Sequence, residues 1–518
     1  MNKQIIKGTF ILAAAGFLTR ILGFFYRIFL SNNIGALGMG LFQMIMPIYG
    51  LCYSISAAGL HTAISKAVAE SNGTGYLFVQ NKDKHANDSN IHILSCGLKI
   101  SLALSVILSA MLFIFSPFIA GQFLGDVSCS RLLKIAALSI PLCSMHSCIT
   151  GYYLGLKKAF IPGFSQLMEQ FARIMFVIVA TNVLISSGSA PDASTAVYGL
   201  LAGELVSALL CFITLSIKHK IPFKSDYPAK QLLNTAIPLT STKVMLSFLN
   251  TLEAMLVPSM LIVSGLSSDE SISTYGILTG MAFPFIFFPS TITNAISSML
   301  LPEMAEARSS NNIKKIRRTI GRTLRYSLIM GIFCTGIFLM YGTNIGTVIY
   351  NNPTAGRYIV ILGWLCPFLY ISTTFGSILN GLGLIKSVFL HNVISLIARI
   401  LFVILCVPHI GITGYLWGIL ASEIICSVLH FISLKKCCTV IESDAVVSIL
   451  IPACAVTLCV TAVKKMTPVL TSVIKFFFGN SADIPVLLFC IFVTGLFFLG
   501  LEIFIDRLLK HFEPSEKS

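Results

Sequence analysis

Two arginines stand inside an apolar stretch near the start of the chain. The stretch runs from Gly8 to Leu30, GTFILAAAGFLTRILGFFYRIFL, and it contains Arg20 and Arg27 but no acidic residue. In a helix, a spacing of seven residues is about two turns, so both side chains lie on one face. Guanidinium groups bind phosphate oxygens through paired hydrogen bonds. The two residues therefore predict a binding site for a phosphorylated anion.

The position of each arginine along this stretch decides how it is interpreted. An arginine at the centre of a bilayer costs about 2.5 kcal/mol or more, so it usually faces a watery cavity or a partner within the protein. Arg27 lies nearer the end of the stretch, and its long side chain can instead extend to the lipid headgroups. Both interpretations of Arg27 stay open, whereas the deeper Arg20 is the stronger candidate for the anion site.

A second polar group lies in the apolar stretch from Leu232 to Gly265. Lys243 is about as deep in this stretch as Arg20 is in the first one, Asn250 follows it by seven residues, and Glu253 follows three residues later. Helical spacing places these side chains on or near one face. We expect Lys243 to face Arg20 and to contribute a second cation to the same binding site.

Four further charges form a repeated pattern. The segment ARIMFVI, which contains Arg173, recurs as ARILFVI with Arg399, and GLLAGEL, which contains Glu204, recurs as GILASEI with Glu423. Each charge lies near the middle of its apolar stretch. We predict two structural ion pairs, Arg173 with Glu204 and Arg399 with Glu423. Glu169, one helical turn before Arg173, is an alternative partner for that arginine.

The overall composition excludes a soluble globular protein. Of the 518 residues, 55% are hydrophobic and 11% are charged, and the mean hydropathy is +0.86, as in an all-α polytopic membrane protein. Fourteen transmembrane helices are expected. They are Gly8–Leu30, Met39–Ile64, Ile91–Ile119, Leu132–Leu156, Pro162–Ser186, Ser194–Ile217, Leu232–Gly265, Ser271–Leu301, Tyr326–Ile349, Tyr358–Leu384, Ser387–Val407, Ile412–Leu434, Ala445–Val463 and Ile484–Ile505.

The net charge of +15 does not indicate a nucleic-acid partner. Most Lys and Arg residues fall in connections on the side of the N-terminus, as the positive-inside rule requires if both termini are cytoplasmic. The connection from Arg308 to Arg325 has seven basic residues and no acidic residue. We expect it to contact the anionic headgroups of membrane lipids.

Internal similarity divides the chain into two lobes. We assign residues 1–217 to a first lobe of six helices, 218–230 to a cytoplasmic linker, 231–434 to a second lobe of six, and 435–518 to two more helices and a cytoplasmic tail. Repeats of an even number of helices are parallel, and they enclose a central cavity. Pro47, Pro284 and Pro289 lie in corresponding helices of the two lobes, where proline gives a hinge. Membrane helices also tolerate proline without such a role.

No catalytic or metal-binding motif is recognisable. The chain lacks a Walker loop, a GxSxG elbow, an HExxH motif and a carboxylate pair in a polar context, so we expect no enzymatic activity and no cofactor beyond a coupling ion of unknown identity. Cys143, His146 and Cys148 resemble metal ligands, but no second cluster accompanies them in the sequence. We therefore expect no metal site.

A series of short motifs resembles the stage V sporulation protein B group. This group belongs to the polysaccharide-transporter branch of the multidrug/oligosaccharidyl-lipid/polysaccharide exporter superfamily, which is related to the lipid II flippases. The motifs are individually weak, but their order is specific and covers essentially the whole chain. They are RILG at 20–23, IGA at 34–36, GLFQM at 40–44, PIY at 47–49, AGL at 58–60, AISK at 63–66, SQLMEQ at 165–170 with Arg173, the segment 276–289, and LPE at 301–303.

The resemblance implies a bacterial cytoplasmic-membrane flippase that moves an undecaprenyl-pyrophosphate-linked sugar by alternating access. It also implies that Arg20 lines a central cavity and contacts the pyrophosphate, while Arg27 is displaced by about one residue from the family position. An acidic residue that lipid II flippases carry early in the second helix has no match at 38–41, and a basic residue of their eighth helix has none at 275–289. The group is tied to spore cortex peptidoglycan, which implies cell-wall synthesis proteins as partners.

Two other functions remain alternatives at this point. A multidrug exporter coupled to sodium ions or protons would use Glu253 as its ion or cation site. A membrane scaffold without transport activity would recruit cortex-synthesising enzymes through the basic segment 308–325.

Overall fold

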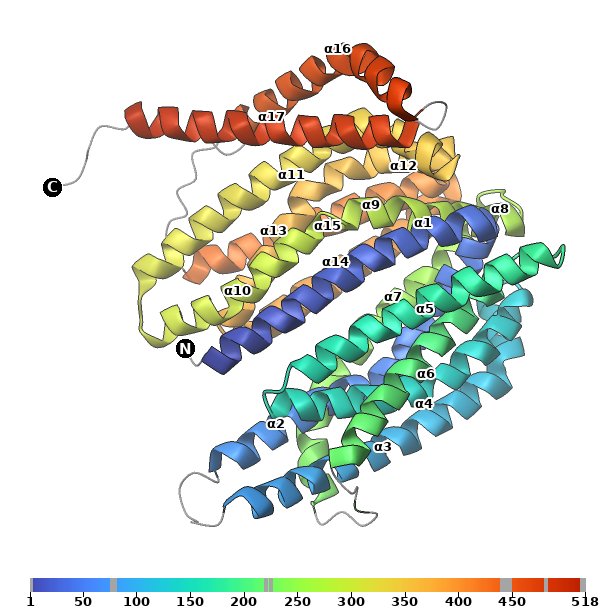
Figure 1. Ribbon diagram of the computed structural model, residues 1–518, viewed down its shortest axis with the longest axis vertical. Coiled ribbons are helices and arrows are strands. Elements are labelled where there is room, and N and C mark those ends of the chain that lie inside the picture. Colours follow the sequence, from blue (N-terminus) through green and yellow to red (C-terminus); the bar gives the residue numbers. More distant parts are fainter. Residues whose placement is uncertain are drawn as a thin grey trace. The chain divides into compact units, whose positions relative to one another are not determined.

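The computed structural model describes residues 3–74, 82–218, 222, 227–437, 450–478 and 483–512, and every regular element within these ranges is a helix (Figure 1). Eleven helices in the described ranges are long and apolar enough to cross a membrane, or twelve if one bent pair counts as a span. The expected class, an all-α multi-pass membrane protein, is confirmed. This count includes Ile11–Ser71 as a single helix, although the segment holds two of the fourteen predicted spans. Counting it as two spans brings the number closer to fourteen.

That segment begins with α1 (Lys3–Tyr53), which continues through the π-helical η1 (Ser54–Ala58) into α2 (Gly59–Thr74). The apolar part, Ile11–Ser71, is 61 residues long, roughly three times the ~20 residues that one crossing needs. The break lies at Gly35, whose φ of 70° and ψ of −175° interrupt the helix. Glycine lacks a Cβ and adopts positive φ at little cost, so the first and second spans separate here.

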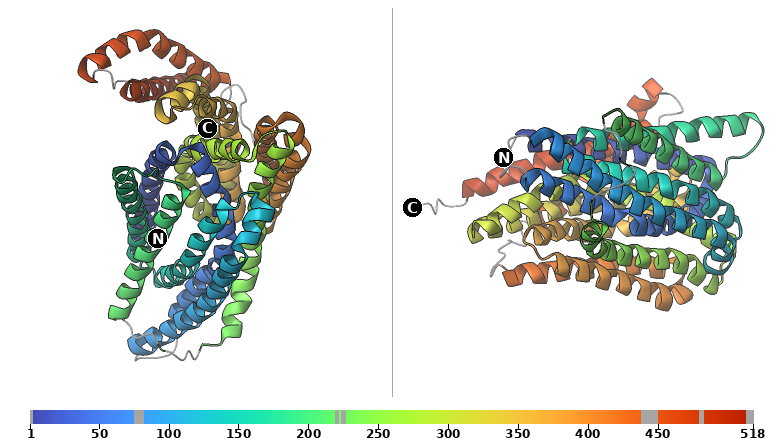
Figure 2. Two further views of the ribbon diagram at one scale, coloured as in Figure 1. Left: turned by 90° about the vertical axis from the view of Figure 1, so that its right-hand side faces the viewer. Right: turned by 90° about the horizontal axis from the view of Figure 1, so that it is seen from below.

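The following helices of the N-terminal half run alongside one another (Figure 2). Contacts join α3 to α4, α4 to α6, and α5 to α6. Tyr152 and Tyr153 of α4 are fully buried in a cluster that also contains residues of α2, α3, α6 and α7. The helices are α3 (Lys82–Phe118), which continues into the π-helical η2 (Ile119–Leu124), α4 (Ser128–Gly155), α5 (Phe160–Ser186), α6 (Ala193–Lys218), α7 (Ala229–Val263) and α8 (Ser268–Gly276).

Two glycines bring α1 and α8 into backbone contact. A Cβ atom added at Gly40 would overlap the carbonyl oxygen of Ile272, and one added at Gly276 would overlap the carbonyl oxygen of Ala36. Small residues let membrane helices approach in this way, since the contact energy comes from close van der Waals packing. The second half of α1 is thereby held against α8.

A broken helix follows α8. The chain continues through the π-helical η3 (Ile277–Ala282) and α9 (Phe283–Phe287) to α10 (Ser290–Ser309), and it bends by 56° at the break before Ser290. Pro284 and Pro289 lie at this part of the chain, as expected for residues that interrupt the helical hydrogen bonds. Pro47, in contrast, lies within α1, which continues to Tyr53. The role of all three prolines as hinges stays a prediction.

The basic segment 308–325 differs from the predicted loop, because most of it is the start of α11. Asn312 caps this helix, and its side chain accepts a hydrogen bond from the Lys315 backbone N–H at 2.9 Å. Ile316, Ile320 and Leu324 follow at intervals of four residues and are buried. One face of the segment therefore packs inside the protein, and this packing stabilises a helix despite the charges on the other face.

The remaining helices form the C-terminal part. α10, α11 and α13 share a buried cluster that contains Met304, Ile320 and Phe375, and α16 and α17 pack against α11. The helices are α11 (Ile313–Tyr350), α12 (Pro353–Leu362), the short 3₁₀ helix η4 (Gly363–Leu365), α13 (Cys366–Gly381), α14 (Ile385–Ile410), α15 (Ile412–Cys437), α16 (Ile451–Phe478) and α17 (Asp483–Phe512).

Contacts divide the chain into two compact units. The first contains residues 1–276 and 403–411, and the second contains 277–402 and 412–518. Helix α7, which we assign to the second lobe from the internal repeat, groups with the first unit by contacts. The lobe boundaries at 217 and 231 stay a prediction, since most of the proposed linker 218–230 lies outside the described residues. Residues 438–449 and the tail 513–518 also lie outside the described residues.

Candidate functional site

The two predicted arginines lie on the exposed side of α1. Arg20 and Arg27 are both exposed, whereas Ala15, Tyr26 and Leu30 of the same helix are buried. Across the part of the chain that the structure describes, no ion pair involves Arg20. Among the described residues, the Arg20 guanidinium group therefore has no carboxylate partner.

The buried side of α1 packs against α5. A Cβ atom at Gly23 would lie 3.6 Å from the amide nitrogen of Gln170, and one at Gly163 would lie 3.3 Å from the Cβ of Ala15. The small residues on both helices make this approach possible. Gly23 lies three residues after Arg20 and four before Arg27, so the face that carries the arginines borders the contact with α5.

Lys243 contacts the junction of η1 and α2. Its ammonium group donates a hydrogen bond to the carbonyl oxygen of Ala58 at 2.7 Å. Ala58 is the last residue of the π-helical turn, where the regular hydrogen-bond ladder of the helix is interrupted. The lysine therefore joins α7 to this turn, a structural role that the sequence did not indicate. Arg20 and Lys243 belong to the same unit, and their sharing of one cavity stays a prediction.

The other two predicted residues of α7 differ in their surroundings. Asn250 is exposed, whereas Glu253 is buried, with 5% of its surface accessible. Between them, the hydroxyl of Thr251 donates to the carbonyl oxygen of Pro47 at 3.0 Å. Thr251 therefore joins α7 to α1 at the proline that we expect to act as a hinge. The role of Asn250 and Glu253 in substrate binding stays a prediction.

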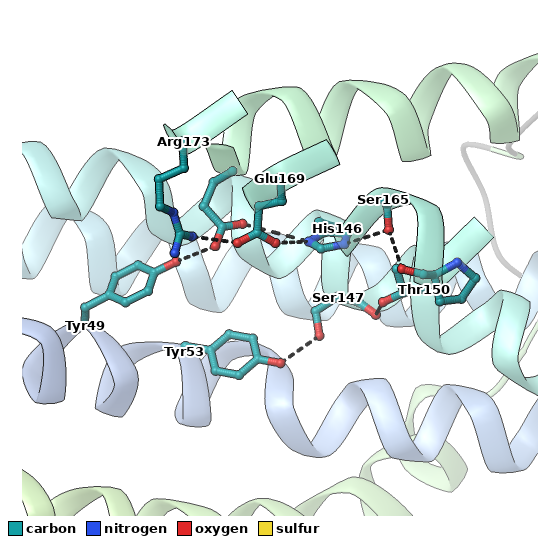
Figure 3. Close-up of polar contacts among 10 residues, drawn as sticks. Tyr49, Tyr53, His146, Ser147, Thr150, Ser165, Glu169 and Arg173 are labelled. Atoms are coloured by element: carbon teal, nitrogen blue, oxygen red, sulfur yellow. Dashed lines mark hydrogen bonds and ion pairs between the residues drawn. The ribbon is translucent and has the colours of Figure 1, made fainter. Parts of the chain in front are cut away.

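The predicted pair of Arg173 with Glu204 is wrong. Arg173 instead pairs with Glu169, whose Oε1 lies 2.6 Å from Nη2. Glu169 lies one turn earlier on the same helix, and this spacing brings the two side chains together without any contact between helices. Glu204 of α6 accepts a hydrogen bond from the Tyr49 hydroxyl at 3.1 Å; Tyr49, Glu169 and Arg173 are labelled in Figure 3.

The corresponding residues of the second repeat lack the second carboxylate. Glu423 accepts a hydrogen bond from the Ser372 hydroxyl at 2.9 Å and lies within electrostatic range of Arg399. Ser395, the counterpart of Glu169, donates to the carbonyl oxygen of Ser422 at 2.8 Å. The pair of Arg399 with Glu423 stays a prediction.

A cluster that the sequence did not reveal surrounds His146 of α4. Its Nδ1 atom lies 3.9 Å from Oε2 of Glu169 and 3.9 Å from Oε2 of Glu204, and its Nε2 atom lies 3.2 Å from the Ser165 hydroxyl (Figure 3). One ligand atom from each of the histidine and the two glutamates falls within 4.8 Å of the others. Our expectation of no metal site considered only Cys143, His146 and Cys148 on one helix. The structure instead combines His146 with residues of α5 and α6.

This His146 cluster opens into a cavity of about 350 Å³. Residues of α1, α2, α4, α5 and α6 line it, and all of them belong to the first unit. Its polar lining includes His61, Gln166 and Tyr53 in addition to the cluster itself. The cavity is large enough for several water molecules, each of which occupies about 30 Å³ in the liquid.

Comparison with known protein families identifies the chain. The polysaccharide biosynthesis protein family matches residues 5–307. The chain belongs to this family. The MatE family also matches residues 244–405, from α7 to α14. The resemblance inferred from the short motifs is thereby confirmed.

Individual relatives match over most of the chain. The stage V sporulation protein B of Bacillus subtilis (strain 168) is 27% identical over 448 residues, which cover 84% of this chain and 85% of that protein. The lipid II flippase MurJ of the same organism is 24% identical over 481 residues, or 84% and 83% of the two chains.

A solved structure of lipid II flippase MurJ, in an inward closed conformation, has the same fold. It superposes with a TM-score of 0.72 at 16% identity, and the match covers 96% of this chain and 99% of that one. At this identity the similarity establishes the fold alone. This member of the polysaccharide biosynthesis protein family therefore shares its fold with a membrane flippase.

Proposed function

We propose that this protein moves an undecaprenyl-pyrophosphate-linked oligosaccharide or peptidoglycan precursor across the bacterial cytoplasmic membrane by alternating access, in spore cortex synthesis. The observation that carries the proposal is Arg20, an exposed cation of α1 with no carboxylate partner among the described residues. It stands in a fold that superposes with a lipid II flippase. A guanidinium group in this setting suits a pyrophosphate, because it offers several charge-assisted hydrogen bonds at once.

The remaining polar residues of α1 and α7 extend this anion site. Arg27 follows Arg20 by two helical turns, and Lys243 and Asn250 of α7 are also exposed. With both termini in the cytoplasm, the cargo enters from the inner leaflet. The membrane potential favours outward movement of an anionic headgroup by about 2.3 kcal/mol per charge per 100 mV, less any charge that the protein carries back. Cell-wall synthesis proteins would then receive the cargo outside.

Transport of a fluorescent lipid-linked precursor in proteoliposomes tests the proposal. Losing a hydrogen bond to a charged group costs about 1.5 to 3 kcal/mol, so Arg20→Ala is expected to slow flipping about tenfold or more, and Lys243→Ala to slow it as well. Arg131→Ala is the matched control, because Arg131 is an exposed arginine near the start of α4. Wild-type rates in both Arg20→Ala and Lys243→Ala would contradict the proposed site.

One observation favours a second function, a multidrug exporter coupled to sodium ions or protons. The MatE match at 244–405 begins directly after Lys243 and includes Glu253, which is buried and is the acidic residue that such an exporter would protonate or use to bind a cation. In that case Glu253→Gln would abolish drug efflux, and Arg20→Ala would leave it unchanged. An efflux assay in cells that express either variant separates the two functions.

A further inference from the structure

The hydrogen bonds of Ser165 favour one tautomer of His146. The Ser165 hydroxyl donates its hydrogen to the carbonyl oxygen of Pro162 at 3.0 Å. It therefore accepts the hydrogen bond from His146 Nε2, 3.2 Å away, and in the neutral ring this nitrogen bears the proton. The other nitrogen, Nδ1, then presents a lone pair toward Glu169 and Glu204 (Figure 3).

Both carboxylates use one oxygen for a protein donor and turn the other toward His146. Oε1 of Glu169 binds Arg173, and Oε1 of Glu204 accepts from Tyr49. The second oxygens each lie 3.9 Å from His146 Nδ1. Oε2 of Glu204 is buried and has no hydrogen-bond partner among the described residues, and only 6% of the glutamate side chain is exposed. Three lone-pair atoms from three helices therefore converge on one point.

The charges around this point do not balance. Glu169 and Glu204 contribute two negative charges and Arg173 contributes one positive charge, so a further positive charge is needed beside His146. An unbalanced carboxylate in a buried setting is costly unless a cation compensates it. The arrangement thus calls for a positively charged species between the three atoms.

We propose that His146 Nδ1, Glu169 Oε2 and Glu204 Oε2 bind one divalent transition-metal ion of the zinc type. Imidazole nitrogen and carboxylate oxygen are common ligands of such ions. The partners of the ligands also match the surroundings of protein metal sites, where the second histidine nitrogen donates to an oxygen and the ligating carboxylates accept further hydrogen bonds. Ser165, Tyr49 and Arg173 supply these contacts here.

The distances are compatible with a bound metal ion. His146 Nδ1 lies 3.9 Å from each carboxylate oxygen. Bonds of about 2.1 Å to a tetrahedral ion place the ligand atoms about 3.4 Å apart, so the ligand atoms, which lie within 4.8 Å of one another, would move inward when an ion binds. The adjacent cavity of about 350 Å³ provides an entry path and room for a water molecule as fourth ligand.

Cobalt titration of the full-length, tag-free protein in detergent tests this site without reference to cargo or transport. After treatment with a chelator, the wild type is expected to bind one Co²⁺ per chain with a visible absorption spectrum, and Zn²⁺ should displace it. His146→Ala and Glu204→Gln should abolish this binding. Ser165→Ala, which removes only the acceptor of the Nε2 proton, should weaken it about 10- to 100-fold.

His391→Ala serves as the matched control. His391 is also buried and lies 3.3 Å from a serine hydroxyl, that of Ser433, but it is not part of the cluster, and its variant should bind cobalt as the wild type does. If His146→Ala or Glu204→Gln does not fold, the result for Ser165→Ala decides. Wild-type protein that binds no more cobalt than these variants would overturn the proposal and leave a proton as the compensating charge.

Discussion

Removing the charge of Arg173 is expected to destabilise the first unit, and Glu169 rather than Glu204 should account for most of the loss. The guanidinium group lies 2.6 Å from Glu169 Oε1, and the two side chains are only 19% and 18% exposed. Breaking a fully buried pair by removing one partner costs about 3 to 5 kcal/mol, because the other charge stays buried, and a half-buried pair such as this one should cost no more than the lower end of that range. We expect Arg173→Gln to lower the free energy of unfolding by about 3 kcal/mol, the lower end of this range.

A double-mutant cycle assigns the partner. Unfolding in mixed detergent micelles, with a chelator present, gives the free energies of Arg173→Gln, Glu169→Gln, Glu204→Gln and the two double variants. The coupling free energy of Arg173 with Glu169 should exceed that with Glu204, since Glu204 already accepts a hydrogen bond from Tyr49. A larger coupling with Glu204 would show that the sequence-based pair, and not the contact in the structure, is correct.

Three further perturbations follow from contacts in the fold. Gly276→Val should separate α8 from α1, because its side chain would overlap the backbone at Ala36. The thermal midpoint of the purified protein should therefore fall more than in Gly16→Val, where no atom lies within 4 Å of the added Cβ. Asn312→Ala should lower the free energy of unfolding by about 1 kcal/mol through loss of the N-cap of α11, and Asn312→Ser should restore most of it. Lys243→Met removes the hydrogen bond to Ala58 and should speed hydrogen exchange of the η1 backbone, which an unchanged exchange rate would contradict.

The membrane spans could be predicted from the sequence because apolar length alone largely defines them. The fifth span, predicted at Pro162–Ser186, is α5 at Phe160–Ser186, and the twelfth, predicted at Ile412–Leu434, is α15 at Ile412–Cys437. The boundary between the first two spans also falls where expected, at Gly35. The start of α11 was missed because its charges resemble a loop, whereas its buried apolar face becomes apparent only in the folded protein.

The contacts between helices could not be predicted from spacing. Arg173 and Glu204 were matched by depth in the membrane, but depth does not specify which face of each helix is turned inward, and the nearer Glu169 forms the pair. His146 was weighed with the cysteines of its own helix for the same reason. Its partners lie on α5 and α6, and only the packing of three helices brings them together. The available sign of this cluster in the sequence was the presence of two acidic residues, Glu169 and Glu204, within apolar stretches.

The central claim is that the cation of α1 binds a pyrophosphate headgroup, and ligand binding measured by native mass spectrometry tests it most directly. Wild-type protein should retain undecaprenyl pyrophosphate at least about tenfold more than the uncharged undecaprenol, in line with a charge-assisted contact. Arg20→Ala should lose this preference, and Arg131→Ala should keep it. An equal preference for the pyrophosphate in wild type and Arg20→Ala would contradict the claim.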